Sequence, residues 1–522
     1  MSECMNKLTG VAIVVVSVLD AAGQPVARPG EVVIAEVTVH DEALRLTLIK
    51  SDYDISDVHG DVLTIYATPD ELAELRALGL ECTETGRQPA PPEFSRPGSK
   101  ALGVYHDYAG VTAALVDFAE SYPDLCRLES LGVSVQGRDI WAMTVTDNPG
   151  IEEDEPEFKY VSTMHGDEPV GTELCLYLLD LLLSEYGATD RITDLVDSTE
   201  IWIVPVMNPD GLERGSRYNA AGYDINRSFP HYPDDFTGTF YDGESEAADG
   251  RPPEVRHIVE WTLDNSFVLS ANIHTGALVV NYPYDAEPGR TSGMDAPTPD
   301  DTLFEDVSRR YSMYNPPMFS STRFTDGITN GCAWYTISGS MQDWNYRYAG
   351  CNEVTLELSD VKRPPESTLP QLWEDNRESM LTYIESVHMG IRGIVDDGRT
   401  GEPLWARIAV AGNEQHVATD PDTGDYHRML LPGEYDLEVS ADGYVSQTVN
   451  DVVVEEAVAA RVDVSLLQPD IDGDGIVGAT DLQLIINAAL GRPVSYNCDI
   501  DGGGMSATDI QRIINIILGY ES

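Results

Sequence analysis

The segment EFKYVSTMHGDEPVGTELCLYLLDLLLSEY, residues 157–186, decides the fold class of the longest part of the chain. It begins with a short β-type run and ends with an apolar stretch long enough for several helical turns. A polar turn, HGDE at 165–168, lies between the two. A strand that leads through a turn into a helix is the repeating unit of an α/β fold, and such folds bind ligands where the strands end.

The same alternation continues on both sides of this segment. The β-type runs are TEIWIVPVM, FVLSANI and NEVTLEL, and a second helical run is RESMLTYIESVHM. We therefore expect an α/β domain over residues 100–388, with helices around a largely buried sheet.

Three other segments flank this domain. Residues 30–88 alternate strand and helix and predict a small α+β module, followed by a loop rich in Pro, Gly and Arg at 87–99. Residues 390–467 have short alternating strands with turn signals, which is typical of an all-β sandwich. Residues 469–522 contain a repeat, ATDLQLIINAALG and ATDIQRIINIILG, starting at 479 and 507. Each copy predicts an amphipathic helix after an acidic loop, and hence a small α-helical module.

The composition limits the possible partners. The chain of 522 residues carries 32 basic and 89 acidic side chains, a formal charge of −57. This charge argues against nucleic-acid binding, which uses Lys and Arg to neutralise phosphates. Lysine is scarce, which suits high ionic strength, although the carboxylates could equally keep a secreted protein soluble. No apolar run reaches about 18 residues, so we expect no membrane span.

Two features bear on the compartment. Lys7 precedes the apolar stretch 8–19 and small residues follow, so residues 1–23 are expected to be a signal peptide that directs export; an edge strand is the alternative. The seven cysteines are too few for a disulfide scaffold. Cys332 and Cys351 bracket a hairpin-like stretch and could form a bridge.

Two histidines and a glutamate give the α/β domain the donor set of a catalytic zinc site. His165 and Glu168 stand in the HGDE turn, and His274 ends the strand-like run FVLSANIH. Three such ligands leave a fourth position for water, whose pKa the metal lowers. Glu357 in NEVTLELS alternates with an apolar strand face and is the candidate proton acceptor.

Several further stretches occur together and in a fixed order. They are HGDE at 165–168, NPDG at 208–211, DINRSFP at 224–230, FVLSANIHTGALVVNYPYD at 267–285, GITNGCAWYTISGSMQDWNY at 327–346 and EVTLELS at 353–359. With these motifs the segment from about 100 to 388 resembles the zinc metallocarboxypeptidases, and most closely the carboxypeptidase E, N and D subgroup. The resemblance implies a central mixed twisted sheet with flanking helices.

This resemblance also implies roles in hydrolysis of a C-terminal peptide bond. His165, Glu168 and His274 would bind one zinc ion. Glu357 would act as general base and then as proton donor, and Arg217 would stabilise the oxyanion.

The remaining matching residues concern the substrate. Asn226 and Arg227 would hold its terminal carboxylate, a task that suits a planar guanidinium, and Tyr335 would close over it. Asp285 and Gln342 match the pocket that receives a basic side chain in that subgroup. We therefore expect the removal of C-terminal Arg or Lys.

Two other functions stay open. The fold could serve a catalytically silent binding or scaffold protein, or a deacylase or peptidoglycan peptidase. The presence of Glu357, Arg217 and Arg227 counts against the first, and that of Asp285 and Gln342 against the second.

The C-terminal repeat contains a calcium-binding pattern. In DIDGDGIVGATD, residues 470–481, oxygen ligands fall at loop positions 1, 3, 5, 7 and 12. These candidate ligands are Asp470, Asp472, Asp474, Ile476 and Asp481, and the shorter second copy retains Asp499, Asp501 and Asp509. We expect one or two calcium ions. The segment resembles a dockerin, which implies a cohesin-type partner on a scaffold or cell surface; a calcium-stabilised tail is the alternative.

The two other flanking modules resemble known neighbours of such enzymes. The sandwich at 390–467 resembles the transthyretin-like domain that follows the catalytic domain in that subgroup. The module at 30–88 is similar in placement to carboxypeptidase pro-segments. It could shield the active-site cleft until proteolysis or be an accessory domain, and the sequence leaves this open together with the natural substrate and the oligomeric state.

Overall fold

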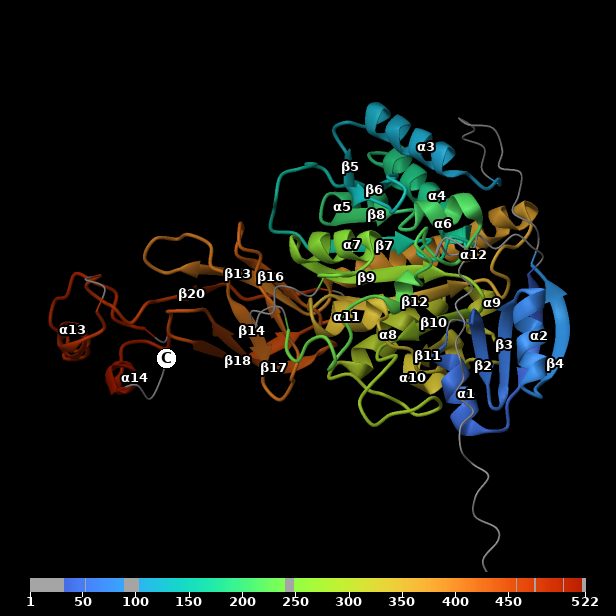
Figure 1. The fold of residues 1–522 in the computed structure, drawn as a ribbon. Coiled ribbons are helices and arrows are strands. Elements are labelled where there is room, and N and C mark those ends of the chain that lie inside the picture. The colour runs from blue at the N-terminus through green and yellow to red at the C-terminus, as the bar shows by residue number, and fades with distance from the viewer. Residues whose placement is uncertain are drawn as a thin grey trace, which may run out of the picture.

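The computed structural model describes residues 32–51, 53–88, 103–239, 248–456, 458–473, 476–500 and 502–518. The expected signal peptide at 1–23 and most of the 87–99 loop lie outside these ranges. Within them, no helix has the length and apolarity needed to cross a membrane. An N-terminal module, a large α/β domain, a β-rich unit and a pair of helices follow one another along the chain (Figure 1).

An eight-stranded sheet, ordered β11-β10-β12-β9-β7-β8-β6-β5, forms the centre of the α/β domain. Its strands are β5 (Cys126–Val133), β6 (Asp139–Val145), β7 (Glu157–Ser162), β8 (Glu200–Val204), β9 (Phe267–His274), β10 (Leu278–Tyr282), β11 (Ile328–Asn330) and β12 (Asn352–Leu358). Strands β12, β9, β7 and β8 run parallel, whereas β6 is antiparallel to both of its neighbours. Strand β10 is antiparallel to β12 and parallel to β11. The sheet is therefore mixed, as the resemblance implied.

Helices cover both faces of this sheet, so its central strands are buried on both sides. They are α3 (Tyr108–Ser121), α4 (Val170–Glu185), α5 (Asp190–Val196), α6 (Pro209–Arg214), α7 (Pro253–Leu263), α8 (Asp301–Ser312), α9 (Pro316–Phe319), α10 (Gly331–Trp334), α11 (Met341–Arg347) and α12 (Leu369–Glu385). Phe158 and Tyr160 of β7 enter the core that contains α3, α4 and α12, whereas Val161 enters the core that contains α7 and α11. This two-sided burial explains the nearly continuous apolar runs of the central strands.

The N-terminal module is an antiparallel sheet of order β2-β3-β1-β4 with two helices and its own apolar core. Its elements are β1 (Val33–Thr38), α1 (Glu42–Ile49), β2 (Ile55–His59), β3 (Val62–Ala67), α2 (Pro69–Ala77) and β4 (Glu81–Arg87). The sequence predicted two strands and two helices in this module and missed strands β2 and β4. Strand β2 is short, and β4 is polar and mostly exposed, so neither has the apolar alternation of a strand.

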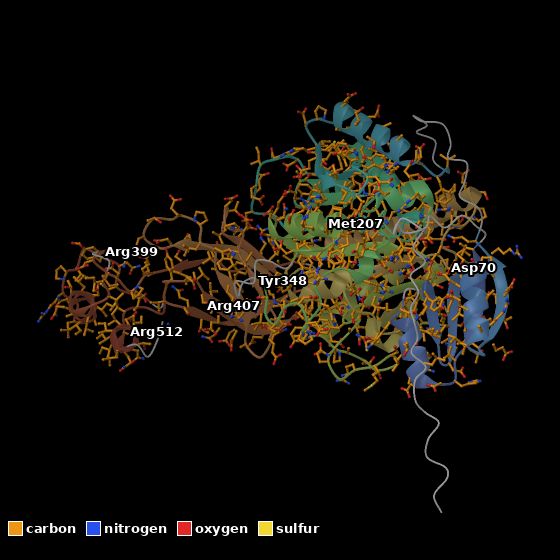
Figure 2. The ribbon with its side chains drawn as sticks, viewed as in Figure 1. Asp70, Met207, Tyr348, Arg399, Arg407 and Arg512 are labelled. Carbon is orange, nitrogen blue, oxygen red and sulfur yellow. The ribbon has the colours of Figure 1, made fainter. Side chains whose placement is uncertain are left out.

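The β-rich unit has two four-stranded sheets, which fits a sandwich around one core. Its strands are β13 (Ile391–Asp397), β14 (Arg407–Val410), β15 (His416–Ala418), β16 (Asp425–Arg428), β17 (Gly433–Ser440), β18 (Gln447–Val454), β19 (Ala460–Arg461) and β20 (Val464–Leu466). The last helices, α13 (Ala479–Ala489) and α14 (Ala507–Leu518), share a small core with Val445 and Leu467 of the sandwich. Figure 2 follows the side chains across these units, from Asp70 in the first to Arg512 in the last.

The two flanking modules contact different parts of the α/β domain. The N-terminal module lies at one side of it, and the sandwich lies at another with the C-terminal helices beyond (Figure 1). A buried ion pair between Arg428 and Asp300, 2.8 Å long, joins the sandwich to the α/β domain.

The expected bridge between Cys332 and Cys351 is wrong, because both thiols are free and buried. The chain between them folds into helices α10 and α11 instead of a hairpin. The Cys332 Sγ atom contacts the carbonyl oxygen of Thr291, and the Cys351 Sγ atom contacts the Ser270 hydroxyl.

Candidate active site

His165, Glu168 and His274 converge at the carboxyl ends of β7 and β9. The Nδ1 atoms of the two histidines are 3.0 Å apart. The two Glu168 oxygens lie 3.1 Å from His165 Nδ1 and 2.9 Å from His274 Nδ1. All three side chains are buried, and one ligand atom of each lies within 4.8 Å of the others. These residues fit a divalent metal with nitrogen and carboxylate ligands, such as zinc.

Polar groups around the histidines fix their orientation. His165 Nε2 lies 3.1 Å from Asp224 Oδ1, and His274 Nε2 lies 3.3 Å from the Asn226 amide. Although burial opposes it, the Arg217 guanidinium holds the pKa of Asp224 well below its ordinary value. Such contacts orient metal-binding imidazoles. The sequence interpretation did not single out Asp224, although it begins the DINRSFP motif.

Two buried cations stand beside the same cluster. Arg217 Nη1 lies 3.1 Å from His165 Nδ1 and 3.6 Å from Glu168 Oε1, and Lys362 Nζ lies 3.1 Å from the same carboxylate oxygen. Burial raises the pKa of Glu168, but His165 and Lys362 outweigh it and hold the pKa well below its ordinary value. The sequence interpretation missed Lys362; the only available signals were the scarcity of lysine and its place just after NEVTLELS.

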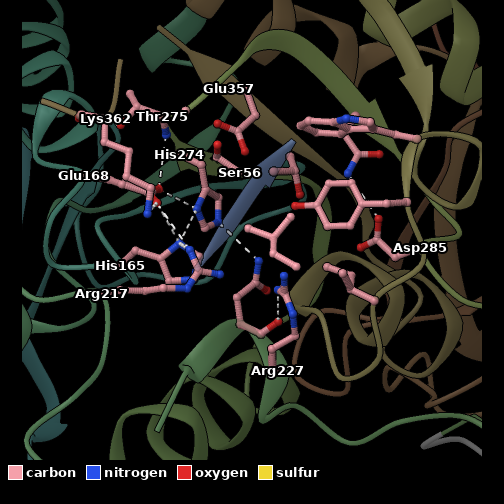
Figure 3. A pocket seen from close by; sticks show the side chains of 18 residues that line it. Ser56, His165, Glu168, Arg217, Arg227, His274, Thr275, Asp285, Glu357 and Lys362 are labelled. Atoms are coloured by element: carbon pink, nitrogen blue, oxygen red, sulfur yellow. Dashed lines mark hydrogen bonds and ion pairs between the residues drawn. The ribbon is translucent and has the colours of Figure 1, made fainter. Parts of the chain in front are cut away.

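Glu357 faces the same cavity from the neighbouring strand. It pairs in register with His274, and its carboxylate points toward the metal-binding cluster (Figure 3). The Oε2 atom has no hydrogen-bond partner among the residues that the structure describes. Burial and the nearby Glu168 raise the pKa of Glu357 well above its ordinary value. The geometry thus provides a carboxyl group able to exchange protons beside the cluster.

The cavity is also lined by the residues expected to contact the substrate, which are Arg217, Asn226, Arg227, Asp285 and Tyr335. Arg217 and Asn226 lie beside the two histidines. In Figure 3, Arg227 and Asp285 lie across the cavity from the two histidines. The structure therefore brings together side chains from segments more than a hundred residues apart.

Asp285 is the acidic residue among those expected to contact the substrate. It is buried, its Oδ1 atom accepts a hydrogen bond of 3.1 Å from Asn281, and its Oδ2 atom has no partner within the described ranges. Burial raises the pKa of Asp285 above its ordinary value. Gln342 does not line the cavity; its amide oxygen accepts a 2.8 Å hydrogen bond from Thr355, which does.

The N-terminal module reaches into the cavity, which is one of the two arrangements that the sequence left open. Asp54 lies 2.8 Å from Lys362 Nζ and 3.3 Å from Arg217 Nη1. Ile55 and Ser56 line the cavity, and Figure 3 shows Ser56 on its strand close to His274. The module thus contributes an anion to the site that contains the buried cations.

The candidate calcium ligands are described only in part. Asp470, Asp472 and Asp481 each place a carboxylate oxygen within 4.8 Å of the others. Asp474 and Asp501 lie outside the described residues. Of the remaining candidates, Ile476 is exposed. Asp509 is buried and accepts hydrogen bonds from the backbone amides of Ile500 and Ser506, and Asp499 Oδ2 accepts one from the amide of Gly504.

A mixed α/β sheet whose strand ends hold two histidines, a glutamate and a second carboxylate defines a metallopeptidase. More narrowly, the chain belongs to the zinc carboxypeptidase family, whose model matches residues 111–379. The model of the carboxypeptidase regulatory-like domain matches residues 390–467, which is the sandwich.

Relatives of known name agree with this assignment. Human carboxypeptidase D is 39% identical over 389 residues, which cover 71% of this chain and 27% of that protein. Mouse carboxypeptidase M is 40% identical over 66% of this chain and 79% of its own length. The catalytic chain of human carboxypeptidase N is 39% identical over 67% and 83%, respectively. The chain therefore spans about a quarter of the length of the carboxypeptidase D relatives, since the match covers 27% of the human protein.

Solved structures share the fold. The carboxypeptidase A of Helicoverpa armigera superposes with a TM-score of 0.54 at 18% identity, covering 67% of this chain and 96% of that one. Thrombin activatable fibrinolysis inhibitor superposes with a TM-score of 0.52 at 16% identity, covering 68% and 98%. At these identities the likeness concerns the fold alone.

Proposed function

We propose that this protein is a zinc-dependent carboxypeptidase that removes a C-terminal Arg or Lys from peptides. The observation that carries the proposal is the convergence of His165, Glu168 and His274, with Glu357 in register with His274 on the neighbouring strand. A zinc ion held by the three ligands would supply a Lewis acid that activates water and polarises the scissile carbonyl.

The chain's own residues account for the other steps. Glu357 takes a proton from the attacking water and later donates it to the leaving amine nitrogen, as its protonatable carboxyl allows. Arg217 stabilises the negative charge that develops on the former carbonyl oxygen. Asn226 and Arg227 hold the terminal carboxylate of the substrate, and Tyr335 covers the bound residue.

The preference for a basic residue is supported by the unpartnered oxygen of Asp285. A buried carboxylate without a cation is unfavourable, and a guanidinium or ammonium group of the substrate would compensate its charge. An apolar side chain at the same place would leave the charge unpaired. The pocket therefore discriminates against neutral C-terminal residues.

Incubation of the purified protein with peptides that differ only in the last residue tests the proposal. We expect the loss of one residue, measured by mass, from peptides ending in Arg or Lys, inhibition by a zinc chelator, and recovery on addition of zinc. Cleavage of N-acyl groups or of peptidoglycan stems instead would favour the deacylase alternative. Absence of any turnover in the zinc-loaded protein freed of its N-terminal module would favour the silent binding protein.

We also propose that the N-terminal module, residues 33–87, inhibits the enzyme while attached. Asp54 would neutralise Arg217 and Lys362, and Ile55 with Ser56 would occupy space that a substrate needs. The indole of Trp334 donates a 2.9 Å hydrogen bond to Asp57 of the same module. These contacts favour the pro-segment over the accessory domain, which the sequence left open.

For the ends of the chain we propose export and a calcium-binding docking tail. The proximity of Asp470, Asp472 and Asp481 supports a cation at the first loop of the tail. A cohesin-type partner on a scaffold or cell surface is the occupant that a dockerin-like repeat implies. Calcium-dependent binding to a panel of cohesins tests this idea, and calcium binding without any cohesin binding would favour a calcium-stabilised tail.

A further inference from the structure

Carboxylates gather where the sandwich meets the amino ends of the central strands, far from the candidate active site. Glu157 begins β7 and pairs in register with Glu200, which begins β8. Asp420 lies in the sandwich, between β15 and β16, and Glu152 precedes β7. One carboxylate oxygen from each of Glu152, Glu157 and Asp420 lies within 4.8 Å of the others. We call these three residues the interdomain carboxylate cluster.

Glu157 is the most deeply buried member of the cluster. Only 3% of the residue is exposed to solvent. The Oε1 atom accepts a 2.8 Å hydrogen bond from the amide of Ser266, whereas Oε2 has no hydrogen-bond partner in the part of the chain that is described. None of the ion pairs found among the described residues involves a member of the cluster. A buried carboxylate with neither a cation nor a donor on one oxygen is unfavourable.

Asp420 is held in place from both modules. Its Oδ2 atom accepts a 3.0 Å hydrogen bond from the Ser266 hydroxyl of the α/β domain. Its Oδ1 atom accepts from the amides of Asp422 at 2.7 Å and Thr423 at 3.2 Å. Ser266 therefore bridges Glu157 and Asp420, so the two carboxylates approach each other in a fixed arrangement.

A neighbouring acidic group shows how the chain compensates such charge elsewhere. Asp154, Asp425 and His427 also converge within 4.8 Å. There, however, Arg461 lies 2.6 Å and Arg392 3.6 Å from Asp154. That group forms ion pairs with its own cations, whereas none of the ion pairs within the described ranges reaches the interdomain carboxylate cluster. The buried Lys159 interacts electrostatically with Glu157 but makes its hydrogen bonds with Thr262 and Asn345.

We propose that the interdomain carboxylate cluster binds a calcium ion that joins the sandwich to the α/β domain. Its ligands are oxygens only, which favours a hard cation over zinc. Glu152 at the rim leaves room for water, and calcium accepts irregular geometry and several waters, whereas magnesium requires near-octahedral ligands. The ion would supply the positive charge that Glu157 lacks and would strengthen the contact between the two modules.

The number of calcium ions bound per zinc-loaded full-length chain tests the site. Equilibrium dialysis at pH 7.5 would compare the natural protein with the double variant Glu157→Gln, Asp420→Asn. A matched control, Glu153→Gln with Asp422→Asn, changes the same residue types at neighbouring positions outside the cluster. We expect the first variant to lose one ion and the control to lose none; an equal number in all three proteins would overturn the proposal.

A second measurement separates a cation site from a purely structural role. If the cluster binds calcium, the variant Glu157→Gln, Asp420→Asn without calcium should unfold at or above the temperature of the calcium-free natural protein, because carboxylate repulsion is removed. A purely structural role predicts a lower unfolding temperature and an unchanged ion count. If that variant does not fold, a second variant tests the site. The triple variant Asp470→Asn, Asp472→Asn, Asp499→Asn leaves the cluster intact and weakens the candidate calcium loops of the tail. This protein must still bind one calcium ion, and failure to do so would contradict the proposal.

Discussion

Buried carboxylates at the two edges of the central sheet differ in the cations that surround them. At the carboxyl edge, Arg217 and Lys362 accompany Asp224 and Glu168, whose pKa values are held well below ordinary despite burial. At the amino edge, burial and Glu200 raise the pKa of Glu157 well above ordinary. Glu168 and Glu157 are both buried, one after the end of β7 and one at its start, so the supply of nearby cations decides their charge. Glu357 and Asp285 form no ion pair within the described ranges, and their pKa values are raised although they lie at the carboxyl edge. Buried carboxylates beside cations stay ionised and available for chemistry. The carboxylates of the amino edge need protons or an external ion to compensate their charge.

The largest expected effect concerns two glutamates on one strand, β12. Glu357 lies near its carboxyl end and faces the cavity, whereas Glu353 lies near its amino end and accepts hydrogen bonds from Ser270 and Asn272. We expect Glu357→Gln to lower kcat by about 10³-fold, since it removes the group that moves the proton. Glu353→Gln should retain most of the activity.

Steady-state kinetics on a peptide ending in Arg would measure both variants, with zinc content determined in parallel. Unchanged zinc in Glu357→Gln would show that the loss concerns proton transfer and not metal binding. Comparable kcat values for the two variants would remove Glu357 from its proposed role.

A smaller effect is expected at Asp285, the one anion at the carboxyl edge whose charge a substrate would compensate. Asp285→Ala should reduce kcat/KM for peptides ending in Arg by about 10²-fold while changing that for Phe much less. Asp295→Asn, an exposed position on the same part of the domain, serves as control. An equal reduction for Arg and Phe would place Asp285 outside the specificity pocket.

A still smaller effect is expected from the inhibitory contact. Asp54→Asn weakens the attraction to Lys362 and Arg217, so basal kcat/KM of the full-length chain should rise by about 10-fold. Asp61→Asn, in the same module but paired with His40, should leave the activity unchanged. An unaltered rate in Asp54→Asn would indicate that the module is an accessory domain.

These comparisons also show where sequence reasoning succeeds. HGDE and FVLSANIH pointed to three side chains that converge in the structure, because a strand end fixes where the next side chains lie, and the long apolar runs predicted the α/β domain. Asp54 and Lys362 could not be paired, since they come from separate modules and no spacing rule connects them. Short polar strands such as β2 were missed because their pairing, and not their apolarity, makes them strands.

The interdomain carboxylate cluster escaped the sequence for the same reason. Glu157 and Asp420 are brought together only by the docking of the sandwich. In a chain with 89 acidic residues, neither position has a local signal that distinguishes it. Only the fold shows which carboxylates have lost access to water and to a cation.

The smallest expected effect is the pH dependence of stability, which should differ in sign between the amino edge and the pair Asp224 and Glu168 at the carboxyl edge. Burial raises the pKa of Glu200 and of Glu155 to about 7, and it raises that of Glu157 well above its ordinary value. Below the unfolded pKa of about 4.5 these groups are protonated in both states; above it the folded state retains protons that the unfolded chain releases. Stability from this edge therefore falls as the pH rises from about 5 to 8. The low pKa values of Asp224 and Glu168 act oppositely, because their contribution is complete above about pH 4.5 and is lost only on acidification.

Calcium should remove the decline at the amino edge, because the ion replaces the protons as the source of positive charge. The charged and titratable groups that face this edge include Arg127, Glu129, Glu152, Glu155, Glu157, Lys159, Glu200, Asp420, Asp422, Asp425 and His427. With the calcium-selective chelator EGTA, we expect the unfolding temperature to fall by about 2–4 °C between pH 6 and pH 8, and saturating calcium should abolish that fall. Glu157→Gln should show a smaller decline even with EGTA. If the unfolding temperature falls equally with and without calcium, protons alone compensate the carboxylates of the amino edge. The difference between the two edges would then come from their pKa values and not from a bound ion.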